Sequence, residues 1–158
     1  MIRMTACDAE HATLSAMRRG YSFVELAVAL AVVGLVTTIT LPSLGRLLDG
    51  IAVERAAAEL TTALAITRNT AVMGARRARL SVAPDSLRLD VWNGDAWEAL
   101  KRWAGPVQLG VTATVSNPAI AFSPLGVGWG ASNTRIVLER GMAGATITAS
   151  RAGRIKRW

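Results

Sequence analysis

Residues 20–45 read GYSFVELAVALAVVGLVTTITLPSLG, and this stretch decides the fold. The twenty residues from Leu26 to Gly45 contain no charged side chain. An α-helix needs about twenty apolar residues to cross a bilayer. Arg18 and Arg19 precede the run, and flanking positive charge favours the cytoplasmic side of a membrane. The sequence therefore predicts one transmembrane helix, with a cytoplasmic amino terminus and an extracytoplasmic remainder.

Two simpler interpretations of the apolar run are an uncleaved signal anchor and a cleaved secretory signal peptide. The run is longer than the about 7–15 apolar residues of a secretory signal, and no A-x-A-like site ends it. Neither interpretation explains Glu25. A carboxylate in an apolar span costs about 2.5–3.5 kcal/mol at the helix centre and less near its end. An acidic residue at this position therefore indicates a function.

The segment Gly20-Tyr21-Ser22-Phe23-Val24-Glu25-Leu26 resembles the processing site of type IV pilins and type II secretion pseudopilins. That site has Gly, an aromatic residue, Thr or Ser, two apolar residues, Glu and Leu. The resemblance implies that a prepilin peptidase cleaves between Gly20 and Tyr21, removes a leader of residues 1–20 and methylates the new amino terminus. It also implies that Glu25 guides assembly, because its carboxylate can pair with the terminal ammonium of a neighbouring subunit and neutralise two desolvated charges.

The chain departs from this family pattern in two ways. Tyr21 stands where Phe is commoner, and the leader is long and contains acidic residues. Met17 offers a second translation start. Cleavage after Gly20 gives the same mature chain from either start.

Composition limits the kinds of chemistry available to the chain. Of its 158 residues, 51% are hydrophobic and 18% are charged, which excludes a disordered protein. The formal charge of +7 permits anionic partners such as nucleic acid or phospholipid headgroups. The one Cys and the one His, Cys7 and His11, both precede the predicted cleavage site. Thiol nucleophiles, histidine bases, disulfides and most metal sites are therefore excluded from the mature chain.

The long helix is predicted to have two halves, a transmembrane half at residues 21–45 and an amphipathic half at residues 46–74. Pro42 removes one backbone hydrogen bond and predicts a bend rather than an end. Beyond it, apolar positions recur at steps of four and three, which is one face of a helix. They are Val53, Ala57, Leu60, Leu64, Thr67 and Ala71. This stripe is expected to pack on a globular head formed by residues 75–158.

The head is predicted to consist of short β-strands. Apolar and β-branched runs alternate there with turn residues. The expected strands are residues 78–83, 87–92, 96–103, 107–115, 119–122, 135–139, 145–150 and 154–158. Asn93-Gly94 predicts a type I′ hairpin turn, which needs positive φ at both residues. One long helix behind seven or eight strands indicates an α+β fold, with the helix laid against two antiparallel sheets.

The carboxy-terminal half carries a second resemblance. The runs Phe122-Ser123-Pro124-Leu125-Gly126, Arg135-Ile136-Val137-Leu138 and Ser150-Arg151-Ala152-Gly153-Arg154-Ile155 are similar to the pattern of the GspH/FimT family of minor pilins and pseudopilins. Many FimT-like members carry a cysteine pair that this chain lacks. With the first motif, the resemblance spans nearly the whole mature chain and implies a type IV pilin-like fold.

No residue pattern indicates an enzyme, a cofactor or a metal site. The carboxylates of the head occur singly, so paired acid–base catalysis has no candidate. The loop at residues 126–130 lacks the G-x-G-x-x-G spacing of a phosphate site and is predicted to be a hairpin loop. The five tryptophans are interpreted as core or subunit-contact residues, with base stacking as the alternative. They are Trp92, Trp97, Trp103, Trp129 and Trp158.

A basic cluster ends the chain. FimT-like pilins of competence systems bind DNA through a Gly-Arg-x-Arg motif, and Gly153-Arg154-Ile155-Lys156-Arg157 is a near match with Lys in the last motif position. Lysine can meet a phosphate as a point charge, without the bidentate geometry of arginine. The plainer interpretation is a soluble strand end. The resemblance thus leaves two functions open. The first is a minor pseudopilin-like subunit of a type II secretion or type IV pilus filament, assembled from the bacterial inner membrane with other pilins. The second is a minor pilin that binds DNA through Arg154, Lys156 and Arg157.

Overall fold

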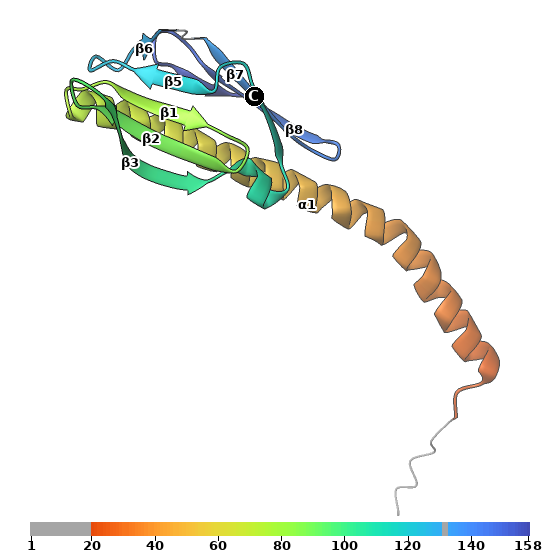
Figure 1. Cartoon of the computed structure of the whole chain (residues 1–158). Helices are drawn as coiled ribbons and strands as arrows, with labels where there is room; N and C mark the ends of the chain where they lie inside the picture. The colour runs from red at the N-terminus through yellow and green to blue at the C-terminus, as the bar shows by residue number, and fades with distance from the viewer. Residues whose placement is uncertain (1–19, 131–132) are drawn as a thin grey trace, which may run out of the picture. The chain divides into compact units, whose positions relative to one another are not determined.

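A computed structural model describes residues 20–130 and 133–158 (Figure 1). The structure divides into two compact units, of which the first ends at Ile39 and the second extends from Thr40 to Trp158. One helix, α1 (Phe23–Met73), belongs to both units. It is followed by β1 (Ala78–Val82), β2 (Ser86–Trp92), β3 (Trp97–Ala104), the 3₁₀ helix η1 (Pro106–Leu109), β4 (Thr112–Val115), β5 (Ala119–Phe122), β6 (Gly128–Trp129), β7 (Thr134–Arg140), β8 (Ala143–Ala149) and β9 (Ile155–Arg157).

The first unit is the apolar start of α1. The large side chains of residues 21–36 are exposed, and α1 is long and apolar enough to cross a membrane. The hydroxyl of Thr37 donates to the carbonyl oxygens of Val33 and Gly34, at 2.9 Å each. The hydroxyl of Thr38 donates to the Gly34 carbonyl oxygen at 2.6 Å. Because these polar groups are satisfied within the helix, the segment is compatible with lipid.

The predicted apolar stripe is confirmed in the second unit. Every member of it is buried against the head: Val53, Ala57, Leu60, Leu64, Thr67 and Ala71. The one hydroxyl in the stripe, that of Thr67, donates to the Ala63 carbonyl oxygen at 2.7 Å and so costs little to bury. The helical periodicity of the sequence alone therefore predicted which face of α1 is buried.

Two antiparallel sheets cover this half of α1, as predicted. Sheet A has the strand order β3-β2-β1-β5-β6, and sheet B has the order β4-β7-β8-β9. In Figure 1, strands β1–β3 run alongside the carboxy-terminal half of the helix. Alternate residues face the core, such as Leu80 in β1 and Ile147 in β8, and the residues between them face outward.

Two local expectations are wrong. The predicted strand at residues 107–115 is η1 followed by the shorter β4, because Pro106 begins a 3₁₀ turn that Gly110 closes in the left-handed region at φ 66°. The β2–β3 connection is a four-residue loop rather than a type I′ turn, and the loop residue with positive φ is Gly94. The side-chain oxygen of Asn93 accepts the backbone N–H groups of Asp95 and Ala96 at 3.0 and 2.9 Å, which stabilises the wider loop.

None of the five tryptophans, expected in the core or in subunit contacts, is fully buried. Trp129 and Trp158 are 50% and 73% exposed, and the other three are half-buried. Arginine and lysine side chains lie over four of the five rings, namely Trp97, Trp103, Trp129 and Trp158. Trp103 packs against the core, as the core interpretation expects, and a role of the other four in contacts with other molecules stays a prediction.

Candidate functional sites

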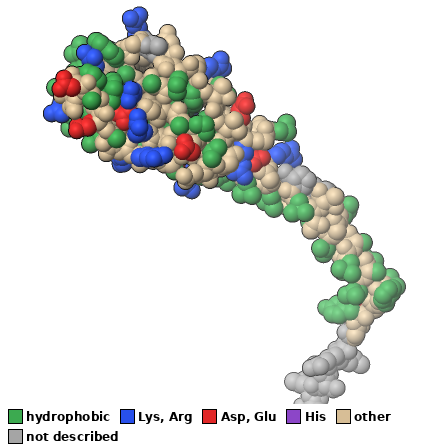
Figure 2. All heavy atoms as spheres, viewed as in Figure 1, with side chains coloured by type: hydrophobic (Ala, Val, Ile, Leu, Met, Phe, Trp, Pro, Cys, Tyr) green, Lys and Arg blue, Asp and Glu red, His purple; other side chains and the backbone are tan. Residues whose placement is uncertain are grey.

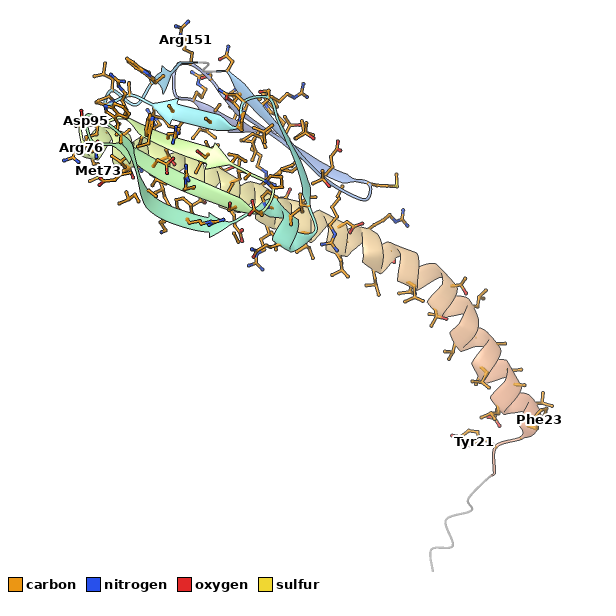
Figure 3. All side chains as sticks on the ribbon, viewed as in Figure 1. Tyr21, Phe23, Met73, Arg76, Asp95 and Arg151 are labelled. Atoms are coloured by element: carbon orange, nitrogen blue, oxygen red, sulfur yellow. The ribbon has the colours of Figure 1, made fainter. Side chains whose placement is uncertain are left out.

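The predicted processing and assembly residues lie together at the start of the described chain. Gly20, Tyr21 and Ser22 precede α1, and Glu25 is in its first turn. These four residues line an open hollow of about 570 Å³. Tyr21 is 83% exposed, and Figure 3 shows it projecting from the chain away from Phe23. The Gly20–Tyr21 peptide bond is therefore outside the helix and open to solvent.

Ser22 is a residue of this segment that sequence reasoning gave no role. Its side-chain oxygen accepts the Val24 backbone N–H at 3.3 Å, and its carbonyl accepts the Leu26 N–H at 3.0 Å, so it caps α1. Glu25 stands three residues after the cap, where an acidic side chain also stabilises the positive end of the helix dipole. The Ser-x-x-Glu spacing was the signal that could have predicted this helix start.

The basic tail does not form a single cluster. Arg154 lies in the turn before β9 and is exposed, and its backbone N–H donates to Ser150 Oγ at 3.2 Å. Lys156 is exposed with its ammonium 5.1 Å from the centre of the Trp158 ring. Arg157 forms an ion pair with Glu54 of α1. Because side chains alternate along a strand, Lys156 and Arg157 point to opposite faces of sheet B.

The two carboxy-terminal motifs meet beside α1. Arg68 of the helix donates from Nε to the Gly126 carbonyl oxygen at 2.8 Å. Gly153 packs so closely on that same carbonyl that a Cβ atom would collide with it. The Gly128 N–H donates to the Arg151 carbonyl oxygen at 2.9 Å and joins the two loops. We call this arrangement the Arg68 clamp. Its residues are distant in sequence, and no local pattern predicted their contact.

A buried carboxylate, Asp90, was also missed. It is 1% exposed on β2, where Arg79 Nη2 lies 2.7 Å from its Oδ2 and Arg88 Nε lies 2.9 Å from its Oδ1. The guanidinium carbon of Arg79 also lies 4.4 Å from the centre of the Trp97 ring. This triad neutralises Asp90 on sheet A, so Asp90 is engaged structurally and is not a free acid or base.

No group of three or more metal-ligating side chains occurs in residues 20–130 and 133–158. Cys7 and His11, like the rest of residues 1–19, lie outside the described residues.

Comparison with known proteins shows what the fold resembles. No protein-family model matches the sequence, and no curated protein has significant sequence similarity to it. Two crystal structures of the type IV minor pilin FimU of Pseudomonas aeruginosa strain PAO1, in different space groups, are similar to the structure. Their TM-scores are 0.58 and 0.57, each with 20% identity over 66% of this chain and 86% and 91% of theirs. The long helix packed on two antiparallel sheets is therefore the type IV pilin fold.

Proposed function

We propose that this chain is a minor pseudopilin-like structural subunit, without enzymatic activity, of a type II secretion or type IV pilus filament. The observation that carries the proposal is the type IV pilin fold combined with an exposed apolar helix that starts at Phe23, two residues after Tyr21. An apolar, fully exposed helical segment needs lipid or other helices around it. The inner membrane before assembly and a filament core after it are surroundings of this kind.

In this proposal the chain has four functional parts. Residues 1–20 are the leader, residues 21–45 the transmembrane half of the helix, residues 46–74 the amphipathic half and residues 75–158 the extracytoplasmic head. A prepilin peptidase is the processing partner, and other pilins or pseudopilins are the assembly partners. The solvent-exposed, non-helical backbone at Gly20 and Tyr21 supports this reading, because a peptidase needs an extended and accessible substrate.

Processing is tested by coexpressing the full chain with a prepilin peptidase and measuring the intact mass. The expected product begins at N-methylated Tyr21, and Gly20→Ala is expected to block its formation. Gly34→Ala is the matched control, since a Cβ at either glycine meets no atom within 4 Å. A chain that keeps its leader beside an active peptidase, or efficient cleavage of the Gly20→Ala variant, would refute the processing step.

Assembly is tested at Glu25. Without its carboxylate the terminal ammonium of a neighbouring subunit would have no partner in an apolar environment, so Glu25→Ala should be cleaved normally but fail to enter filaments. Glu98→Ala removes the same charge from an exposed position on β3 and should assemble normally. Filament incorporation, followed by cross-linking in membranes, compares the two variants. Normal incorporation of Glu25→Ala would refute the charge-pairing role.

DNA binding by the basic tail is the second candidate function. It is favoured by the exposure of Arg154 and Lys156, neither of which has an ion pair within the described ranges, whereas Arg157 is held by Glu54. Duplex DNA binding should then fall steeply with salt and weaken in a variant with both residues changed to Ala. A variant with Lys101 and Arg135 changed to Ala removes the same charge elsewhere on the head. Equal binding by the two variants would refute a tail-specific site.

A further inference from the structure

The outward face of sheet A gathers aromatic and arginine side chains. Ala78 and Leu80 of β1 point into the core, so Arg77 and Arg79 point outward. Arg79 is opposite Asp90 on β2, and on its other side it is opposite Ala121, which is itself opposite Trp129 on β6. Five side chains on this face form what we call the tryptophan–arginine face: Arg77, Arg79, Trp92, Trp97 and Trp129.

The side chains of this face pack against one another. The guanidinium carbon of Arg77 lies 4.2 Å from the centre of the Trp129 ring, and that of Arg79 lies 4.4 Å from the centre of the Trp97 ring. Trp92 and Trp97 pack edge to face with their centres 5.4 Å apart. These contacts order long side chains before any ligand arrives, which lowers the entropy cost of binding.

A hollow of about 390 Å³ lies at one end of the face. Arg76, Arg77, Trp92 and Asn93 are among the residues that line it, and none of its lining residues is acidic. Within residues 20–130 and 133–158, neither Arg76 nor Arg77 forms an ion pair. Two unneutralised guanidinium groups beside an aromatic ring are suited to a ligand that has both an anionic group and a planar group.

Positive charge continues beyond the hollow. Strand β6, which carries Trp129, is joined to Arg151 by the hydrogen bond from the Gly128 N–H. Arg151 is exposed, and Figure 3 shows its side chain projecting into solvent. Lysine and arginine side chains are also prominent over the visible surface of the head in Figure 2. Arginine side chains therefore lie both at the hollow and beside strand β6.

We infer that the tryptophan–arginine face binds single-stranded nucleic acid. Unpaired bases stack on tryptophan rings and guanidinium planes, and their phosphates pair with Arg76 and Arg77. A duplex keeps its bases stacked inside and cannot use the aromatic part of the face. An acidic peptide could pair with the arginines but would gain nothing from the stacked rings. This inference is independent of filament assembly and involves residues other than the basic tail.

The test is a titration of fluorescein-labelled oligothymidylate with the full chain in mild detergent, followed by anisotropy at several salt concentrations. Changing Arg76 and Arg77 to Ala should reduce the slope of log affinity against log salt by about 1.4, because two phosphate contacts are lost from a single strand. Trp129→Ala should weaken binding at least about fivefold. Asp95→Asn, in the loop that follows Gly94, should strengthen binding by removing a carboxylate near the hollow.

The control is the variant with Lys101 and Arg135 changed to Ala, which lowers the net charge by the same amount and should keep the original salt slope. Equal losses in the two double variants would overturn the inference in favour of general electrostatic attraction. Competition by duplex DNA or polyglutamate as strong as that by unlabelled oligothymidylate would also overturn it. Loss of binding on changing Arg154 and Lys156 alone would assign the nucleic acid to the basic tail.

Discussion

Gly153 allows a sharp test of the Arg68 clamp. Its φ of 73° lies in the left-handed region, and a Cβ atom there would collide with the Gly126 carbonyl oxygen and lie 3.1 Å from Arg68 Nε. Gly153→Ala therefore strains the backbone and pushes apart the two loops that the Gly128–Arg151 hydrogen bond joins. The change adds one methyl group and no charge, so its effect on the free energy of unfolding comes from geometry.

The cost of Gly153→Ala has two parts. Alanine in a left-handed conformation costs about 1–2 kcal/mol relative to glycine. Displacing the Gly126 carbonyl breaks the 2.8 Å hydrogen bond from Arg68, and a hydrogen bond to a charged group contributes about 1.5–3 kcal/mol. The expected loss of stability is about 2.5–5 kcal/mol. At about 4 °C per kcal/mol for a unit of this size, the melting temperature should fall by about 10–20 °C.

Gly130→Ala is the matched control. Gly130 also has a positive φ, 81°, but a Cβ atom there meets nothing within 4 Å. It should lose only the backbone part, about 1–2 kcal/mol. Unfolding of the full chain in mild detergent, followed by tryptophan fluorescence, compares the two variants. If Gly153→Ala is no less stable than Gly130→Ala, the collision and the lost hydrogen bond are not what stabilises this region.

The other predictions concern the core and its ion pairs, and the same unfolding measurement checks each. Asp90→Ala should lower the free energy of unfolding by about 2–3 kcal/mol. This is less than for a fully buried pair, because the two arginine partners are partly exposed and regain water. A change below about 0.5 kcal/mol would contradict a stabilising role of the triad. Leu60→Ala should lower the free energy of unfolding by about 2–5 kcal/mol, because Leu60 is fully buried. Leu47→Ala, at an exposed position of α1, should lower it by less than about 0.5 kcal/mol. Similar values for the two variants would mean that the buried face of the helix is assigned wrongly. Arg140→Ala removes a 2.8 Å ion pair to Asp49 and should cost about 1–2 kcal/mol, and no further loss on adding Asp49→Ala would confirm that the two residues act as a pair.

The features that the sequence determined are those that depend on near neighbours along the chain. The apolar run after Glu25 predicted the membrane-compatible part of α1, and the four-and-three spacing from Val53 to Ala71 predicted its buried face. Alternation and turn residues located most strands of two antiparallel sheets. Each of these signals works within a few residues, because helical and extended backbones repeat every 3.6 and 2 residues. They failed at Pro106 and Asn93, where one side chain or ring selects among several short turns.

Other features were decided only by the tertiary structure. Arg68 and Gly126 are 58 positions apart, and their contact depends on how the helix and both sheets pack. Strand pairing placed Asp90 opposite Arg79, and the packing of sheet A brought Arg77 over Trp129. A sequence states which residues are charged or aromatic. It does not state which of them meet, because that depends on long-range strand pairing, in which a shift of one residue exchanges the two faces of a sheet.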